Sequence, residues 1–217
     1  MLATAAMRRA CTRTLCTSPR VMRPTSQPTL SFDPSAKTAM DKQEPPAPGA
    51  DFRVVIVGAG NINFGSDEGP WNHSFRLEHK LGPRLKVVAL IDPDAERARR
   101  VLKTKCQSFV LSAYKDTVVY PTFKDYMESV RAETYPHAVW VGSPPAFRGG
   151  TEPGRNLEQL LTAGLPNVPL FIEKPVSTGA VDQTFEVAKM LERNGSLVSV
   201  GYMLRYLKVV QKMKQII

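Results

Sequence analysis

The feature that most restricts the fold of this chain is an alternation of short apolar segments with longer amphipathic ones. Apolar, β-branched segments predict strands at residues 53–57, 85–91, 120–123, 138–141, 169–172 and 197–200. Helical periodicity lies between them, at residues 74–81, 94–104, 124–133, 156–163 and 181–194. Strands that alternate with helices form a parallel sheet through right-handed crossovers, with helices on both faces. The sequence therefore predicts an α/β fold with a doubly wound parallel sheet.

Composition excludes several classes of protein. The 217 residues include no run of about 20 apolar residues, so no membrane-spanning helix is expected. Three cysteines, Cys11, Cys16 and Cys106, are too few and too scattered for a disulfide framework or a zinc site, and no metal site is expected. The formal net charge of +9 is concentrated in residues 1–40, which hold six basic residues and one acidic residue. The remaining 23 basic and 19 acidic residues are typical of a solvated surface, so no nucleic-acid partner is expected.

The first 50 residues differ in texture from the rest of the chain. Residues 1–40 are rich in Arg, Ser, Thr and Ala and almost free of acid, a composition typical of a mitochondrial transit peptide. The alternative is a disordered tail, or an upstream extension of a cytoplasmic protein that starts at Met40. The proline-rich stretch 43–50 predicts a linker that does not pack. We therefore expect a disordered presequence and linker over residues 1–50 and a folded domain over residues 51–200.

A glycine motif, VVIVGAGNINFG, directly follows the first predicted strand. Gly58 permits a tight turn, and Gly60 lets the backbone approach a pyrophosphate that the N-terminus of the next helix also faces. The third position of the G-x-G-x-x-G pattern is Asn63, so the fingerprint is incomplete, and an ordinary strand-to-loop turn is the alternative. About ten extra residues, including Trp71, separate this motif from the next predicted helix, either as a surface elaboration or as a flap over the cofactor.

An acidic residue, Asp92, ends the second predicted strand. In a dinucleotide-binding fold this position accepts hydrogen bonds from the adenosine ribose. A carboxylate there repels a 2′-phosphate, which favours NAD over NADP, while Arg97, Arg99 and Arg100 nearby keep NADP open. Asp92 also fits the N-cap of the following helix, with Pro93 at the first helical position.

Two more segments follow predicted strands and would reach the same edge of the sheet. One is the Gly-Ser-Pro-Pro loop that contains Ser143 and Pro144, and the other is Glu173-Lys174-Pro175. A lysine at the carboxyl end of a strand faces the ligand crevice of an open α/β sheet, where desolvation favours catalytic use. The alternative for Lys174 is an ordinary surface lysine.

Taken in order, these segments resemble those of the Gfo/Idh/MocA oxidoreductases. The resemblance extends from about Phe52 to the end of the chain, and it includes the segment GYMLRY at residues 201–206. It implies a Rossmann domain that binds NAD or NADP, followed by a second α/β domain that completes a site for sugars, polyols and related diols. It also implies cofactor contacts from a shared set of residues: Gly58, Gly60, Ile62, Asp92, Ser143, Pro144 and Glu173.

The resemblance further implies a chemical role for Lys174, which would lie beside the substrate hydroxyl as part of a proton relay, and a cis peptide bond at Pro175. The chain departs from the family pattern at Asn63, in its enlarged turn, and at Phe147-Arg148, where the family commonly has a histidine.

The end of the sequence carries one more expectation. Residues 204–217 predict a helix with an apolar face that nothing later in the sequence covers. We therefore expect residues 201–217 to begin a second domain that is largely missing, and self-association through this helix is a further expectation. The leading hypothesis is an NAD(P)-dependent oxidoreductase, or its nucleotide-binding half, acting on a carbohydrate-like substrate. The alternative is a catalytically silent dinucleotide-binding or regulatory protein.

Overall fold

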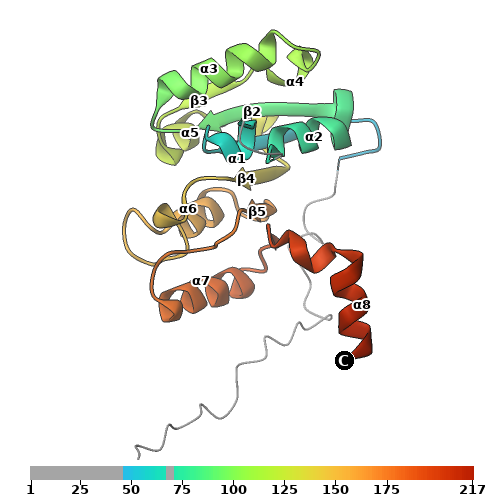
Figure 1. Ribbon diagram of the computed structural model, residues 1–217. Coiled ribbons are helices and arrows are strands. Elements are labelled where there is room, and N and C mark those ends of the chain that lie inside the picture. The colour runs from blue at the N-terminus through green and yellow to red at the C-terminus, as the bar shows by residue number, and fades with distance from the viewer. Residues whose placement is uncertain (1–45, 67–70) are drawn as a thin grey trace, which may run out of the picture. The chain divides into compact units, whose positions relative to one another are not determined.

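The computed structural model describes residues 46–66 and 71–217, and these residues contain a parallel sheet of six strands in the order β3-β2-β1-β4-β5-β6 (Figure 1). The expected presequence at residues 1–40 lies outside the described residues. The strands are β1 (Phe52–Val57), β2 (Leu85–Ile91), β3 (Val118–Tyr120), β4 (Ala138–Val141), β5 (Leu170–Ile172) and β6 (Val198–Val200). All neighbouring strands pair in parallel, which confirms the doubly wound, Rossmann-type α/β fold.

Helices connect the strands, and one more helix follows the last strand. They are α1 (Asn61–Phe64), α2 (His73–Leu81), α3 (Ala95–Cys106), α4 (Leu111–Tyr114), α5 (Phe123–Ser129), α6 (Leu157–Gly164), α7 (Val181–Arg193) and α8 (Lys208–Ile216). Short 3-10 turns lie at Gly82–Arg84, Ala132–Thr134, Pro145–Phe147 and Met203–Tyr206. No helix in the described ranges is long and apolar enough to cross a membrane.

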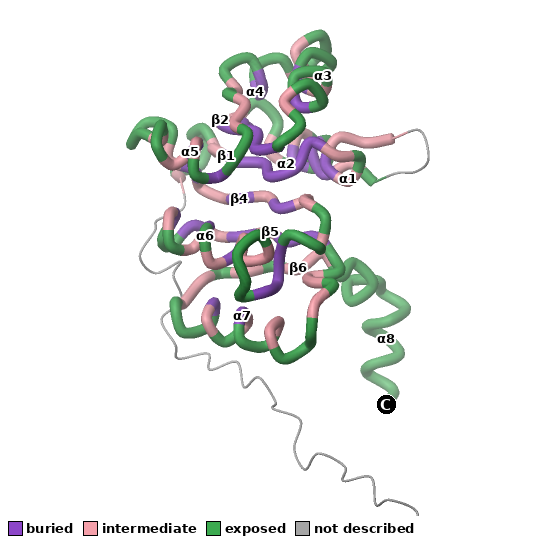
Figure 2. The backbone as a smooth tube through the Cα atoms, turned by 90° about the vertical axis from the view of Figure 1, so that its left-hand side faces the viewer, coloured by how far each residue is buried: buried purple, intermediate pink, exposed green. Residues whose placement is uncertain are grey.

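Two hydrophobic cores lie on opposite faces of the sheet because successive strand residues point to opposite sides. In β1, Val55 and Val57 pack with residues of α5, α6 and α7, whereas Val54 and Ile56 pack with residues of α2, α3 and α4. The buried residues follow the central strands (Figure 2). This two-sided burial explains why the strand sequences are apolar throughout rather than alternating.

Three predicted elements differ from the structure. The strand expected at residues 120–123 is β3, which ends at Tyr120, because Thr122 caps α5 in a reciprocal hydrogen-bond pair with Asp125. The helix expected at 124–133 ends at Ser129. The helix expected at 204–217 is divided by Leu207, whose backbone is extended between a 3-10 turn and α8.

Candidate functional site

A cavity of about 380 Å³ lies at the carboxyl edge of the sheet, where the loops after β1, β2, β4 and β5 meet. The strand order reverses between β1 and β4, and ligands of open α/β sheets bind in the crevice at such a switch point. All eight residues predicted from the sequence line this cavity: Gly58, Gly60, Ile62, Asp92, Ser143, Pro144, Glu173 and Lys174. The fold thus brings together side chains that are more than a hundred residues apart in the chain.

Gly58 forms the tight turn after β1. Its φ is +97°, a conformation that side chains rarely adopt, and a Cβ on it would lie only 3.0 Å from the backbone nitrogen of Ser143. The glycine therefore lets the first turn and the loop after β4 touch, so that both form one wall of the cavity.

Asn63 stands where the fingerprint has its third glycine, and it is completely buried. Its Nδ2 donates to the carbonyl oxygens of Val57 and Gly58, at 3.1 and 2.7 Å. A Cβ on Gly142, in the loop after β4, would collide with this amide. The residue that faces Asn63 is therefore a glycine. Asn63 therefore stabilises the glycine turn through two hydrogen bonds and does not widen it.

The helix predicted at residues 74–81 is confirmed as α2, but a short helix that the sequence did not predict precedes it. Only one turn, α1, follows Gly60, and the long helix α2 begins at His73. Asn72 separates them: its Oδ1 accepts from the backbone nitrogen of Phe75 as the N-cap of α2, and its Nδ2 donates to the carbonyl of Phe64 at 3.2 Å. The enlarged turn thus ends in a residue that fixes α2 to α1.

Asp92 lies at the end of β2 and is nearly fully buried. Its Oδ2 accepts from the backbone nitrogen of Ala59 at 2.6 Å, and its Oδ1 accepts from the backbone nitrogen of Asp94 and from Arg97, both at 2.8 Å. The alternative that Asp92 is the N-cap of α3 is wrong: the cap is Asp94, which accepts from the backbone nitrogen of Arg97. Asp92 therefore ties the glycine turn to the start of α3.

Glu173 and Lys174 follow β5. One carboxylate oxygen of Glu173 accepts from the backbone nitrogen of Lys174, and the other lies 3.1 Å from Nε2 of His73. Lys174 is exposed at the mouth of the cavity, and the Lys174–Pro175 peptide bond is cis, which confirms that expectation. Both residues that the sequence singled out after β5 thus face the cavity.

His73 was not predicted as a site residue. It is buried against the rings of Trp140 and Phe171. Burial lowers the pKa of His73 below its ordinary value, despite the neighbouring Glu173. The neutral ring therefore donates from Nε2 to Glu173, and its buried Nδ1 has no hydrogen-bond partner. Nothing in the local sequence marks this contact, because 100 residues separate the two side chains.

Arg148 is a second residue that the sequence did not assign to the site. It is 1% exposed, and its guanidinium donates to the carbonyl oxygens of Ser143 and Val176. Burial lowers its pKa, while the buried Glu158 opposes that change. Arg148 thus joins the loop after β4 to the segment after Pro175. The departure from the family pattern at this position was the one signal available in the sequence.

The residues around the cavity fit a dinucleotide. Ser143 presents a buried hydroxyl that has no protein partner, and the space beside Gly60 is open where a Cβ would project. Within the described part of the chain, no cluster of His, Cys, Asp or Glu is arranged to hold a metal ion. A 3-2-1-4-5-6 sheet with a glycine turn at its switch point defines a Rossmann-type nucleotide-binding domain.

Sequence comparison gives the family. The family described as "Oxidoreductase family, NAD-binding Rossmann fold" matches residues 52–202, and this chain therefore belongs to the Gfo/Idh/MocA family and contains its NAD-binding domain. Two uncharacterized proteins of Schizosaccharomyces pombe are 44% and 45% identical to it over 77% and 81% of the chain. The chain spans 44% of the length of each of these curated relatives.

Solved structures share the fold at low sequence identity. The dehydrogenase WlbA from Chromobacterium violaceum, in complex with NADH and UDP-GlcNAcA, superimposes with a TM-score of 0.54 at 16% identity, over 79% of this chain and 41% of that one. A super-repressor mutant of Gal80p from Saccharomyces cerevisiae gives 0.55 at 17% identity, over 77% and 38%. Myo-inositol 2-dehydrogenase from Lactobacillus plantarum gives 0.50 at 18% identity, over 76% and 40%.

Proposed function

We propose that this chain is the cofactor-binding part of an NAD-dependent oxidoreductase that acts on a sugar, a polyol or a related diol. The observation that carries the proposal is the meeting of all eight predicted residues around one cavity at the switch point of the sheet. The structural relatives include a WlbA dehydrogenase in complex with UDP-GlcNAcA and a myo-inositol 2-dehydrogenase, which supports a hydroxyl-rich substrate.

In this proposal different residues along the cavity contact different parts of the cofactor and the substrate. Gly58, Gly60 and Ile62 hold the pyrophosphate, and Ser143 and Pro144 line the nicotinamide side. When bound, the nicotinamide ring supplies or accepts a hydride. Lys174, whose ammonium lies at the mouth of the cavity, exchanges a proton with the substrate hydroxyl, and Glu173 orients the cofactor ribose beside it.

The choice of NAD over NADP follows from Asp92. Its buried carboxylate faces the cavity, and its partner Arg97 is already engaged with it at 2.8 Å. A 2′-phosphate would meet this carboxylate at a cost of roughly 1–4 kcal/mol, so NADH should bind at least about fivefold more tightly than NADPH. Calorimetric titration of both cofactors measures this ratio, and equal dissociation constants would contradict the choice of NAD.

Cofactor binding itself is tested on the 217-residue chain. Gly58→Val places a side chain against Ser143 and forces a strained φ, so NADH binding should be lost. Gly154→Ala is the matched control, because Gly154 also has a positive φ, +83°, but has open space around it and does not line the cavity. An unmodified chain that fails to bind NADH or NADPH would overturn the proposal.

The proton-transfer role of Lys174 requires an assay of turnover. In the natural polypeptide that carries this domain, Lys174→Ala should lower kcat by about 10²–10⁴-fold for a reactive sugar or inositol. NADH affinity should stay within twofold of wild type. Undiminished turnover in this variant would remove Lys174 from the mechanism.

A second candidate function is a silent regulatory protein, because the structural relatives include the transcriptional regulator Gal80p. In that case NADH binds with the same residues, yet none of a panel of UDP-sugars, uronates and inositols is oxidised or reduced. Binding without turnover by the natural polypeptide would favour this candidate over the enzyme.

Two further proposals concern the ends of the chain. We propose that residues 1–40 direct import into mitochondria, because they are basic and almost free of acid. Fusion of this segment to a fluorescent protein tests the proposal, and cytoplasmic fluorescence would refute it.

We also propose self-association through the apolar side chains of α8, such as Val210 and Met213, which are exposed. A monomer by light scattering would refute it.

A further inference from the structure

The segment after the enlarged turn reaches the two residues that follow β5. Trp71 and His73 lie on either side of Asn72, and they contact the adjacent residues Lys174 and Glu173. His73 donates to Glu173, while the Trp71 ring centroid lies 5.9 Å from Nζ of Lys174. Two positions of one segment, separated by one residue, thus hold two adjacent positions of another.

Trp71 is placed to act on the lysine rather than on the core. Trp71 is 39% exposed, and its ring has a second cation nearby, because Cζ of Arg76 is 6.0 Å from its centroid. An ammonium within about 6 Å of an indole face is attracted by the ring quadrupole. The indole therefore restricts an exposed lysine side chain, which would otherwise sample many rotamers.

Asn72 anchors this segment at its centre. It caps α2 and also donates to the carbonyl of Phe64, the last residue of α1. Since α1 directly follows the glycine turn, the contacts run continuously from the turn that lines the cavity to the lysine at its mouth.

We propose that Trp71 and His73 are positioning residues. Trp71 holds the ammonium of Lys174 where it exchanges a proton with the substrate hydroxyl, and His73 holds the carboxylate of Glu173 where it orients the cofactor ribose for hydride transfer. This inference rests on the proposed function. It gives the enlarged turn a role at the reactive end of the cavity, whereas the unmodified fingerprint would serve only the phosphates. Neither side chain exchanges a proton or a hydride itself.

Competitive labelling of lysines tests the Trp71 contact without a substrate or cofactor. The 217-residue chain is treated with limiting acetic anhydride, and acetylation of Lys174 relative to the exposed Lys124 is measured by mass spectrometry of peptides. Trp71→Ala should raise the relative rate at Lys174 by about threefold or more, because the amine loses its cover and its cation–π partner. Trp71→Phe should stay within about twofold of wild type because it keeps an aromatic face.

Phe75→Ala is the matched control. Phe75 is an aromatic residue of α2 that is 59% exposed and does not contact Lys174, so labelling at Lys174 should not change. An unchanged rate in Trp71→Ala, with an unchanged melting temperature, would overturn the role of Trp71. A chain that shows the labelling effect but binds no NADH would instead overturn the proposed function and leave the Trp71–Lys174 contact standing.

The role of His73 is tested by two substitutions in the natural polypeptide. His73→Gln retains a donor for Glu173 and should keep kcat within a few-fold, whereas His73→Ala should lower kcat by about tenfold or more with little change in the KM for NADH. Equal kcat in His73→Ala and wild type would overturn the positioning role. A loss in both variants with a matching fall in melting temperature would show a purely structural role, and would overturn it also.

Discussion

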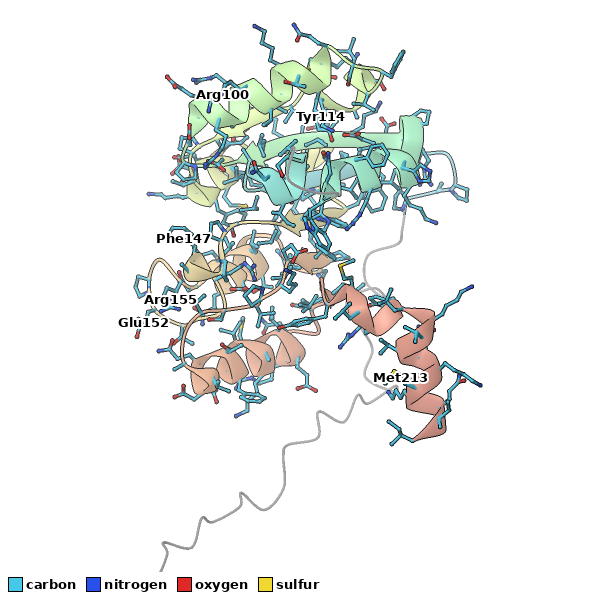
Figure 3. All side chains as sticks on the ribbon, in the orientation of Figure 1. Arg100, Tyr114, Phe147, Glu152, Arg155 and Met213 are labelled. Atoms are coloured by element: carbon cyan, nitrogen blue, oxygen red, sulfur yellow. The ribbon has the colours of Figure 1, made fainter. Side chains whose placement is uncertain are left out.

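Helix α2 takes part in two buried polar contacts. Each contact involves a carboxylate, and the two differ in the groups that donate to that carboxylate. At its first residue, the neutral ring of His73 donates to Glu173, at the edge of the cavity. Near its middle, one oxygen of Glu78 accepts from Lys105 of α3 and from Tyr114 of α4, both at 2.7 Å (Tyr114 is labelled in Figure 3). The first contact leads to the cavity, and the second joins α2 to α3 and α4 on the same face of the sheet.

The difference separates a ligand site, at Glu173, from a structural anchor, the network of Glu78, Lys105 and Tyr114. Glu78 has a cation and a hydroxyl as partners, and its side chain is largely buried, so the network is complete without a ligand. Glu173 has a neutral partner, and unpartnered polar atoms of His73 and Ser143 lie in the same region. Buried polar groups are normally paired, so the incomplete region is where a ligand would supply what is missing.

The largest expected effect on stability comes from Glu78→Ala. The variant leaves Lys105 and Tyr114 largely buried without their acceptor, so the free energy of unfolding should fall by about 3 kcal/mol. Urea denaturation measures this loss, and NADH affinity of the folded fraction should stay within twofold. Glu78→Gln, which keeps an acceptor oxygen, should lose about half as much. A loss of NADH affinity without a loss of stability would break the distinction between site and anchor.

Arg148→Met should affect both properties. It removes two hydrogen bonds that join the loops after β4 and β5, and leaves Glu158 without its nearby cation. We expect a loss of about 2 kcal/mol in the free energy of unfolding and a NADH dissociation constant at least fivefold higher. Arg193→Met, at an exposed position on α7, is the control and should change neither. Unchanged cofactor affinity in Arg148→Met would show that Arg148 serves the core alone.

Tyr114→Phe sharpens the description of the anchor. Burial and Glu78 raise the pKa of Tyr114 far above its ordinary value, so the phenol stays protonated and donates at any physiological pH. Its removal should cost about 1 kcal/mol, since Glu78 keeps Lys105. Thermal denaturation measures the change, and a loss as large as that of Glu78→Ala would show that the hydroxyl, and not the ion pair, dominates the network.

The smallest expected effect is a pH dependence that arises at His73. Burial lowers its pKa in the folded state below the ordinary 6.5, so the unfolded chain binds a proton first as the pH falls. Stability should therefore decline as the pH falls below 6.5, until the pH passes the folded pKa. Urea denaturation between pH 7.5 and 5.5 should show a shallower decline in His73→Gln than in wild type. His137, whose pKa burial also lowers, is present in both proteins and cancels in the comparison. Identical slopes would contradict a buried, neutral His73.

The sequence predicted the strands at the centre of the sheet well because apolar, β-branched runs such as that of β1 are local signals. It missed α1 and α4, which are single turns of four residues, too short to show a period. It misplaced β3 because the capping pair of Thr122 and Asp125 outweighs the apolar pattern around it. Prediction therefore failed where a few hydrogen bonds decide an element boundary.

By itself, the sequence determined the strand and helix alternation, the glycine turn and the polar residues that follow each strand, since each of these is a property of neighbouring residues. The tertiary structure alone decided which of those residues meet. The pairing of His73 with Glu173, the hydrogen bond from Ala59 to Asp92 and the burial of Arg148 between two loops depend on the order of the strands. Contacts across a sheet join residues that no local period relates, and burial, which sets the pKa of His73, exists only after the chain has folded.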